Sequence, residues 1–80
     1  MKTIIIKYCV RWASFKTKAV RLADKIKKEL NLKELNLNVE LVEGSRGEFS
    51  VLLNDTLIAQ KGWILFPNQN KVVEDIRLSL

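Results

Sequence analysis

The residue with the clearest chemical potential is the only cysteine, Cys9, which follows an apolar run and precedes a long amphipathic segment. A thiol between the carboxyl end of a strand and the start of a helix lies near backbone N–H groups that stabilise an anion. The cations Lys7 and Arg11 favour the thiolate, whereas burial beside Tyr8 and Trp12 opposes it. Dithiol redox chemistry needs a second thiol, which the chain lacks. Two interpretations of Cys9 therefore remain: a reactive monothiol or a small, inert core residue.

Composition argues against several other kinds of site. The chain has 80 residues, one cysteine and no histidine, so neither an internal disulfide framework nor histidine-based metal or acid–base chemistry is supported. No apolar run approaches the roughly 20 residues that span a bilayer, and the apolar run at the amino terminus is too short for a signal peptide. We therefore expect a single domain over residues 1–80, located in the cytoplasm, with no metal and no bound cofactor.

Positive charge is concentrated in the first part of the chain. Residues 1–28 contain nine lysines and arginines and one acid, whereas residues 29–80 contain five and eight, which gives a net charge of +5. Four cations recur at helical spacing and form a candidate anion surface, largely unpaired within the helix: Lys18, Arg21, Lys25 and Lys28. Its partner would be nucleic acid, an acidic protein face, glutathione or a membrane surface. The alternative is a solvated helix face that serves only solubility.

Hydrophobic periodicity divides the first half into a strand, a helix and a second strand. Residues 3–8 are rich in β-branched side chains and apolar on both faces, which predicts a central strand. Residues 15–30 predict a helix that ends at Asn31 and has Ser14 as its N-cap, or that starts one or two residues earlier. Its apolar stripe consists of Phe15, Ala19, Leu22, Ala23, Ile26 and Leu30. Residues 35–42 alternate, which predicts a strand with these side chains inward: Leu35, Leu37, Val39 and Leu41.

The second half predicts a hairpin followed by a helix. A glycine-containing loop at 43–47 leads into a third strand at 48–53, in which Phe49, Val51 and Leu53 share one face. Asn54 and Asp55 tolerate left-handed conformations and form the turn to a fourth strand at 56–60. After an irregular segment at 61–67, residues 70–78 predict a helix capped by Asn70. Its apolar stripe consists of Val72, Val73, Ile76 and Leu80.

The element order is therefore βαβββα. The first strand–helix–strand unit predicts parallel strands joined by a right-handed crossover, and the last two strands predict an antiparallel hairpin. Because the second strand is buried on one side only, we expect an α/β protein built as an α+β two-layer sandwich. Its four-stranded mixed sheet would carry both helices on one face.

Several short motifs, in this order and at this spacing, resemble those of a known family. They are Tyr8-Cys9 at the end of the first strand, residues 47–51 opening the hairpin, residues 54–58 around its turn, and Phe66-Pro67 before the last helix. Over nearly its whole length the chain resembles the selenoprotein W-like (Rdx) family. The resemblance implies a thioredoxin-like fold, a role in thiol redox homeostasis, and interaction with glutathione or partner proteins.

The chain departs from the family at its redox motif, which is Cys-x-x-Cys or Cys-x-x-selenocysteine. If Cys9 matches the first position, Trp12 occupies the second. Because some bacterial relatives have Arg-Trp directly after their second cysteine, Cys9 alternatively matches that second position. Under either alignment one redox residue is missing. The resemblance therefore supports at most monothiol exchange or glutathionylation through Cys9, and dithiol oxidoreductase activity is not expected.

Protein binding is an alternative function for the same end of the molecule. Exposed tryptophans beside a motif loop are effective interface anchors, and the candidate partner surface consists of Arg11, Trp12, Trp63 and Phe66. These aromatic residues would otherwise cover the edges of a small core. A noncatalytic interaction module on a thioredoxin-like scaffold is thus the second hypothesis. Nucleic-acid binding by the basic helix face is the third.

Overall fold

The first strand forms the centre of the sheet. The structure is a computed structural model that describes residues 1–62 and 65–80. Its elements are, in chain order, β1 (Lys2–Tyr8), α1 (Ala13–Glu29), β2 (Leu37–Glu43), β3 (Phe49–Leu53), β4 (Thr56–Gln60) and α2 (Gln69–Ser79). The strands lie in the order β2-β1-β3-β4, with β1 parallel to β2 and antiparallel to β3. The predicted βαβββα order and mixed four-stranded sheet are confirmed, and the arrangement is consistent with a thioredoxin-like fold.

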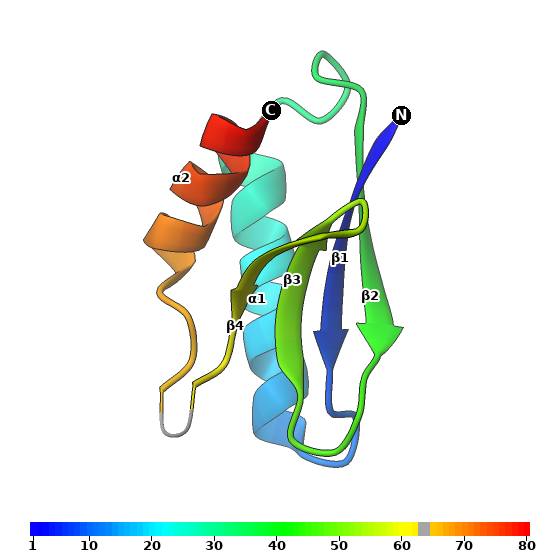
Figure 1. Cartoon of the computed structure of the whole chain (residues 1–80), viewed down its shortest axis with the longest axis vertical. Helices are drawn as coiled ribbons and strands as arrows, with labels where there is room; N and C mark the ends of the chain where they lie inside the picture. The colour runs from blue at the N-terminus through cyan, green and yellow to red at the C-terminus, as the bar shows by residue number, and fades with distance from the viewer. Residues whose placement is uncertain (63–64) are drawn as a thin grey trace.

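Both helices cover one face of the sheet (Figure 1), where α1 packs across β1 and β2 and α2 packs beside β4. The burial of β1 follows from this arrangement: Ile4 and Ile6 are fully buried beneath the helices, whereas Thr3 and Ile5 on the other face are only half-buried. The helices contribute these buried side chains: Phe15, Ala19, Leu22, Ala23 and Ile26 from α1, and Val72, Val73 and Ile76 from α2. The two-layer α+β sandwich predicted from the sequence is therefore confirmed, with one continuous core between its layers.

The predicted hairpin turn at Asn54 and Asp55 is confirmed, and it is tied to the central strand. Asn54 adopts φ 54°, a left-handed conformation that asparagine tolerates better than most residues. Its side-chain Oδ1 accepts the Thr3 N–H at 3.0 Å, and its own N–H donates to the Thr3 carbonyl oxygen at 2.7 Å. The turn therefore joins β3 to β4 and also anchors the hairpin to β1.

The predicted N-caps of both helices are wrong. Helix α1 begins at Ala13, so Trp12 rather than Ser14 occupies the N-cap position, and the Trp12 side chain makes no capping hydrogen bond. The cap of α2 is Asn68, whose side chain accepts a backbone N–H three residues further on, whereas Asn70 lies inside the helix. Before α2 the sequence offers two asparagines, and which one caps the helix depends on where the chain leaves the preceding segment, whereas α1 begins before its only candidate cap, Ser14.

The second strand is shorter and less buried than predicted. Residues 32–36 form turns, with Asn36 at φ 55°, so β2 begins only at Leu37. Leu35 therefore lies outside the strand and is 42% exposed. Leu41 is paired with Ile6 in the sheet but is 41% exposed, because β2 is an edge strand. The expected inward row is thus reduced to Leu37 and Val39.

Three smaller differences concern the ends of elements. Helix α1 ends at Glu29, and Leu30 rather than Asn31 is its C-cap. Strand β3 begins at Phe49 rather than at residue 48. Leu80 follows α2 and is exposed, so it does not belong to the apolar stripe of that helix. These differences lie within the usual uncertainty of element boundaries.

Candidate functional site

Cys9 lies directly after β1, at the junction between the central strand and α1. Its backbone N–H donates to the carbonyl oxygen of Glu48 at 2.8 Å, and the Gly44 N–H donates to the carbonyl oxygen of Tyr8 at 2.9 Å. These two hydrogen bonds hold the β2–β3 loop, residues 44–48, against the end of β1. Cys9 itself is only 2% exposed, so the thiol is covered in this conformation.

Backbone N–H groups around the thiol favour its anionic form. The pKa of Cys9 is lowered chiefly by a hydrogen bond from the Gly47 N–H, with further contributions from the N–H groups of Arg11 and Trp12 and from the charge of Arg11. Burial raises this pKa, but the net shift is downward from the ordinary value of 9.0. The thiolate is therefore stabilised from two sides, by the start of α1 and by the β2–β3 loop.

The carboxylate of Glu48 holds the β2–β3 loop in shape. It accepts the Ser45 N–H at 2.8 Å and the Ser50 hydroxyl at 3.0 Å. The bond from the Ser45 N–H is the main reason that the pKa of Glu48 is lowered, and the Ser50 hydroxyl and the charge of Lys7 act in the same direction against partial burial. The same loop holds Gly47 at φ 75°, a conformation that strains residues with a side chain. The loop is therefore preorganised to direct the Gly47 N–H at Cys9.

A cluster of aromatic rings connects the start of α1 to the segment before α2. We call it the aromatic cluster, and it consists of Trp12, Phe15, Phe49 and Phe66. The ring centroids of Trp12 and Phe15 are 5.2 Å apart, those of Phe15 and Phe66 are 4.9 Å apart, and those of Phe49 and Phe66 are 5.2 Å apart. The pairs that include Phe66 meet edge to face, which is a favourable geometry for aromatic rings.

The candidate partner surface is brought together only in part. Trp12 is 43% exposed at the Cys9 end, and its ring lies beside Gly47. Arg11 is exposed next to it, whereas Phe66 is half-buried and reaches Trp12 only through Phe15. Trp63 lies outside the described residues. The exposed part of this surface is therefore formed by Arg11 and Trp12.

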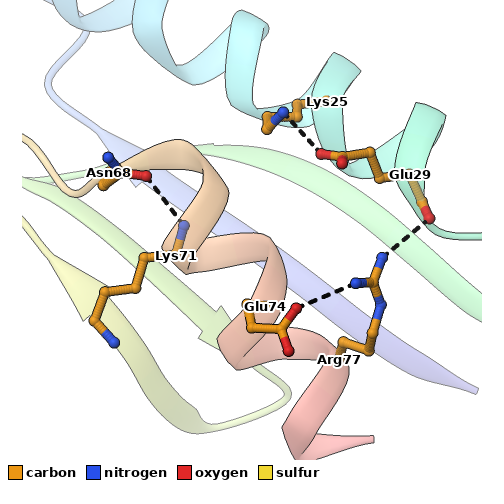
Figure 2. A network of polar contacts seen from close by, with 6 residues as sticks. All are labelled: Lys25, Glu29, Asn68, Lys71, Glu74 and Arg77. Atoms are coloured by element: carbon orange, nitrogen blue, oxygen red, sulfur yellow. Dashed lines mark hydrogen bonds and ion pairs between the residues drawn. The ribbon is translucent and has the colours of Figure 1, made fainter.

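The candidate anion surface on α1 is partly neutralised. Lys25 forms an ion pair with Glu29 at 2.8 Å, so the expectation that these cations are largely unpaired is wrong for this residue. Figure 2 shows this pair and the guanidinium of Arg77, which pairs with Glu74 on α2 and donates to the carbonyl oxygen of Glu29 at 3.4 Å. The Nζ atom of Lys18 lies 4.8 Å from the ring centroid of Phe66.

The two remaining cations of this surface, Arg21 and Lys28, are exposed. They line a groove between α1 and α2 whose other charged residues are Asp24, Lys25 and Glu29. The carboxylates of Asp24 and Glu29 therefore lie among the cations and lower the net positive charge of this surface.

Sequence reasoning missed the groups that shape the thiol's surroundings. The Gly47 N–H and the Glu48 carboxylate come from a loop that is far from Cys9 in sequence, and nothing local marks them. The available signal was the spacing of Glu48 and Ser50 together with a glycine before them, which is compatible with a side-chain-stabilised turn but also with an ordinary surface loop. Only the sheet register, which places Phe49 opposite Tyr8, brings this loop to the thiol.

Within residues 1–62 and 65–80 there is no group of three or more cysteine, aspartate and glutamate side chains that could hold a metal ion. Neither helix found in this part of the chain is long and apolar enough to cross a membrane. The chemistry that the described residues offer is therefore centred on one thiol held between backbone N–H groups.

Comparisons with known proteins agree with the fold. The model of the Rdx family matches residues 3–78. A crystal structure of a protein from Bordetella parapertussis is similar to this chain with a TM-score of 0.69 and 23% sequence identity, and the match covers 99% of this chain and 98% of the other. No curated protein matches the chain. The structural likeness extends over the full length of both chains and shows a shared fold.

Proposed function

Because the chain belongs to the Rdx family, we propose that it is a selenoprotein W-like thiol protein that forms mixed disulfides through Cys9. One observation supports this proposal above all others: the N–H groups of Gly47, Arg11 and Trp12 converge on the Cys9 thiol and lower its pKa. Surroundings that lower the pKa of a thiol are typical of reactive cysteines and not of inert, structural ones. We place this chemistry in the cytoplasm, where glutathione is the abundant thiol.

The proposed step is attack of the Cys9 thiolate on one sulfur of glutathione disulfide. The bond between Cys9 Sγ and the glutathione sulfur forms as the S–S bond breaks, and the second glutathione leaves as a thiolate that takes a proton from water. Cys9 is oxidised and the leaving glutathione is reduced. The chain has no second cysteine to displace the bound glutathione, so an external thiol must release it.

Burial sets a condition on this reaction. Cys9 is 2% exposed, so a disulfide reaches it only when covering residues move, and we expect the β2–β3 loop to be among them because the Gly47 N–H bonds the thiol. The Cys9 N–H bond to the Glu48 carbonyl oxygen and the two bonds accepted by the Glu48 carboxylate oppose that movement. We therefore expect a thiol with a lowered pKa and a limited maximal rate of reaction, because the thiolate is stabilised but its exposure is intermittent.

The decisive test is the pH dependence of Cys9 alkylation by iodoacetamide, followed by incubation with glutathione disulfide and mass spectrometry. We expect the alkylation midpoint to lie below that of an unstructured cysteine peptide, and one glutathione to be added per chain. The Cys9→Ser variant should take up neither reagent. A midpoint equal to that of the peptide, together with no glutathione adduct, would reject the proposal.

Protein recognition without catalysis is the second candidate, and the exposure of Trp12 and Val10 beside the covered thiol favours it. These side chains are 43% and 49% exposed, and an exposed tryptophan next to a fixed loop can anchor a partner. Under this alternative, binding of a partner protein survives Cys9→Ser and is weakened by Trp12→Ala. The reverse pattern, loss with Cys9→Ser and retention with Trp12→Ala, would favour thiol exchange instead.

A further inference from the structure

A cavity of about 440 Å³ lies between α1, β3 and the segment that leads into α2. It is lined by Lys18, Leu22, Phe49, Leu65, Phe66, Pro67 and Gln69. Its volume falls within the range of pockets that hold small molecules. Cys9 does not line it, so a ligand in this cavity would have a role separate from thiol exchange.

The lining of the cavity is mixed, with polar surface at Lys18 and Gln69 and apolar, partly aromatic surface elsewhere. Leu22 and Phe49 belong to the core, and Phe66 packs edge to face against Phe49 at a centroid distance of 5.2 Å. Leu65 is 76% exposed and lies on the outer side, together with the half-buried Pro67. These walls favour a ligand with a compact apolar body, and the two phenylalanine rings favour an aromatic one because rings pack well edge to face.

The charged residues in and beside the cavity indicate which chemical group the other end of the ligand would carry. Lys18 is the only ionisable residue among those that line the cavity, and its Nζ atom lies 4.8 Å from the Phe66 ring centroid. Arg21, one turn further along α1, lines the adjoining groove, which shares Gln69 with the cavity. Arg21 is exposed and makes no ion pair or hydrogen bond with the described residues. An anionic group is therefore favoured at this end.

The adjoining groove also limits how much negative charge the ligand carries. Asp24 and Glu29 line it, and the ion pair of Glu29 with Lys25 already uses one of its cations. A second or third negative charge on the ligand would extend toward these carboxylates and be repelled. The site is thus suited to a single negative charge, and a nucleotide or another polyanion fits it poorly.

We propose that this cavity binds a small aromatic monocarboxylate. Its ring would pack against Phe49 and Phe66, and its carboxylate would lie beside Lys18 and Arg21. Among the described residues the Lys18 ammonium contacts only the face of the Phe66 ring, so it can turn toward the carboxylate at little cost because such cation–π contacts are weak.

The test uses phenylacetate as the probe and follows the backbone amide signals of the full chain by NMR. We expect saturable shifts confined to the residues around the cavity, with a dissociation constant on the order of 1 mM for so small a ligand. The neutral isostere phenylacetamide should bind about threefold to fivefold more weakly, which is the effect expected for partly exposed charges. Phenylethylamine, with a positive charge, should not bind.

Single substitutions test whether the charge of Lys18 itself, and not a general change in the protein, accounts for the preference for phenylacetate. Lys18→Gln should remove the preference for phenylacetate over phenylacetamide, and Lys18→Arg should retain it. Lys27→Gln is the matched control, because Lys27 is an exposed cation on the same helix that does not line the cavity. Leu65→Glu places a carboxylate at the outer side without altering the core, so it should weaken the binding of phenylacetate more than that of phenylacetamide.

Three outcomes would overturn the proposal. They are an absence of saturable shifts with phenylacetate, equal affinity for phenylacetate and phenylacetamide in the wild type, and equal losses in Lys18→Gln and Lys27→Gln. Because none of these measurements involves Cys9, they succeed or fail independently of the thiol chemistry.

Discussion

The two helices of this protein begin in different ways. At the start of α2, the side chain of Asn68 accepts the Lys71 N–H at 3.1 Å and its carbonyl oxygen accepts the Val72 N–H at 3.0 Å. At the start of α1, Trp12 occupies the same position without a capping side-chain bond, and neither helix has an acid in its first turn. One helix start is therefore satisfied by its own side chain, and the other is not.

The two helix starts also differ in what the backbone N–H groups near them bind. Around the start of α1, the N–H groups of Arg11 and Trp12 are directed at the Cys9 thiol. A side-chain oxygen at the N-cap would bind N–H groups of the first helical turn, at residues 14 or 15, so it would not compete for the N–H groups of Arg11 and Trp12. The donors to the thiol at this end therefore lie at the N-cap of α1 and just before it, whereas the side-chain bond at the start of α2 stabilises that helix.

The largest expected effect comes from Gly47→Ala, which changes the surroundings of the Cys9 thiol on the side of the β2–β3 loop. Gly47 has φ 75°, so a side chain there costs roughly 1–2 kcal/mol of stability. The N–H of Gly47 would also shift away from Cys9, so the pKa of Cys9 should rise. Denaturant unfolding and the pH profile of alkylation measure the two effects.

The matched control for this variant is Gly62→Ala. Gly62 has no positive φ, and among the described residues the nearest atom to an added Cβ is the Leu65 carbonyl oxygen at 3.9 Å, which is an ordinary contact. Gly62→Ala should change neither the free energy of unfolding nor the pH profile of Cys9 alkylation appreciably. If Gly47→Ala leaves the alkylation profile unchanged, the β2–β3 loop does not contribute to the stabilisation of the thiolate.

The next effect in size concerns the capped helix start. Asn68→Ala removes the side-chain acceptor for the Lys71 N–H and should cost about 1 kcal/mol of the free energy of unfolding. The pH profile of Cys9 alkylation should not change, because α2 supplies no donor to the thiol. Asn70→Ala is the control: Asn70 is exposed inside the helix, so its loss should cost little. Equal destabilisation by the two variants would contradict the assigned cap.

The sequence predicts the architecture well because the architecture follows from periodicity. The apolar run of β1 and the stripe of α1 each require burial on a defined face, and together with the hairpin they leave few arrangements. The wrong predictions concern residues whose environment depends on other parts of the chain. Leu41 alternates correctly but is exposed because β2 is an edge strand, and the α2 cap was misplaced because two asparagines were available.

The candidate site is less predictable for the same reason. Cys9 and its place between strand and helix can be recognised from the sequence, since both elements are local. The strongest donor to its thiol, Gly47, belongs to a loop nearly forty residues away, and it reaches Cys9 only through the pairing of Tyr8 with Phe49. No local pattern encodes that register, because it depends on how the hairpin docks against the central strand.

The smallest expected effect comes from Glu48→Gln. This variant distinguishes the role of the Glu48 hydrogen bonds in shaping the β2–β3 loop from the role of the Glu48 charge. The pKa of Glu48 in the folded protein is lowered from its ordinary value of 4.5, chiefly by the Ser45 N–H. Its carboxylate therefore contributes stability that is fully present above about pH 4.5 and is lost as the pH falls through the folded-state pKa. The wild type should lose stability in this acidic range more steeply than Glu48→Gln, as thermal unfolding at a series of pH values can measure.

Glu43→Gln, which removes an exposed carboxylate at the end of β2, controls for the general effect of charge. The same pair of variants also tests the thiol. If Glu48 acts by holding the Gly47 N–H in place, Glu48→Gln raises the pKa of Cys9 because that donor is loosened. If its negative charge were the dominant influence, removing the charge would instead lower the pKa of Cys9. The direction of the shift in the alkylation midpoint decides between the two, and a downward shift would show that the loop's bonds do not position the donor.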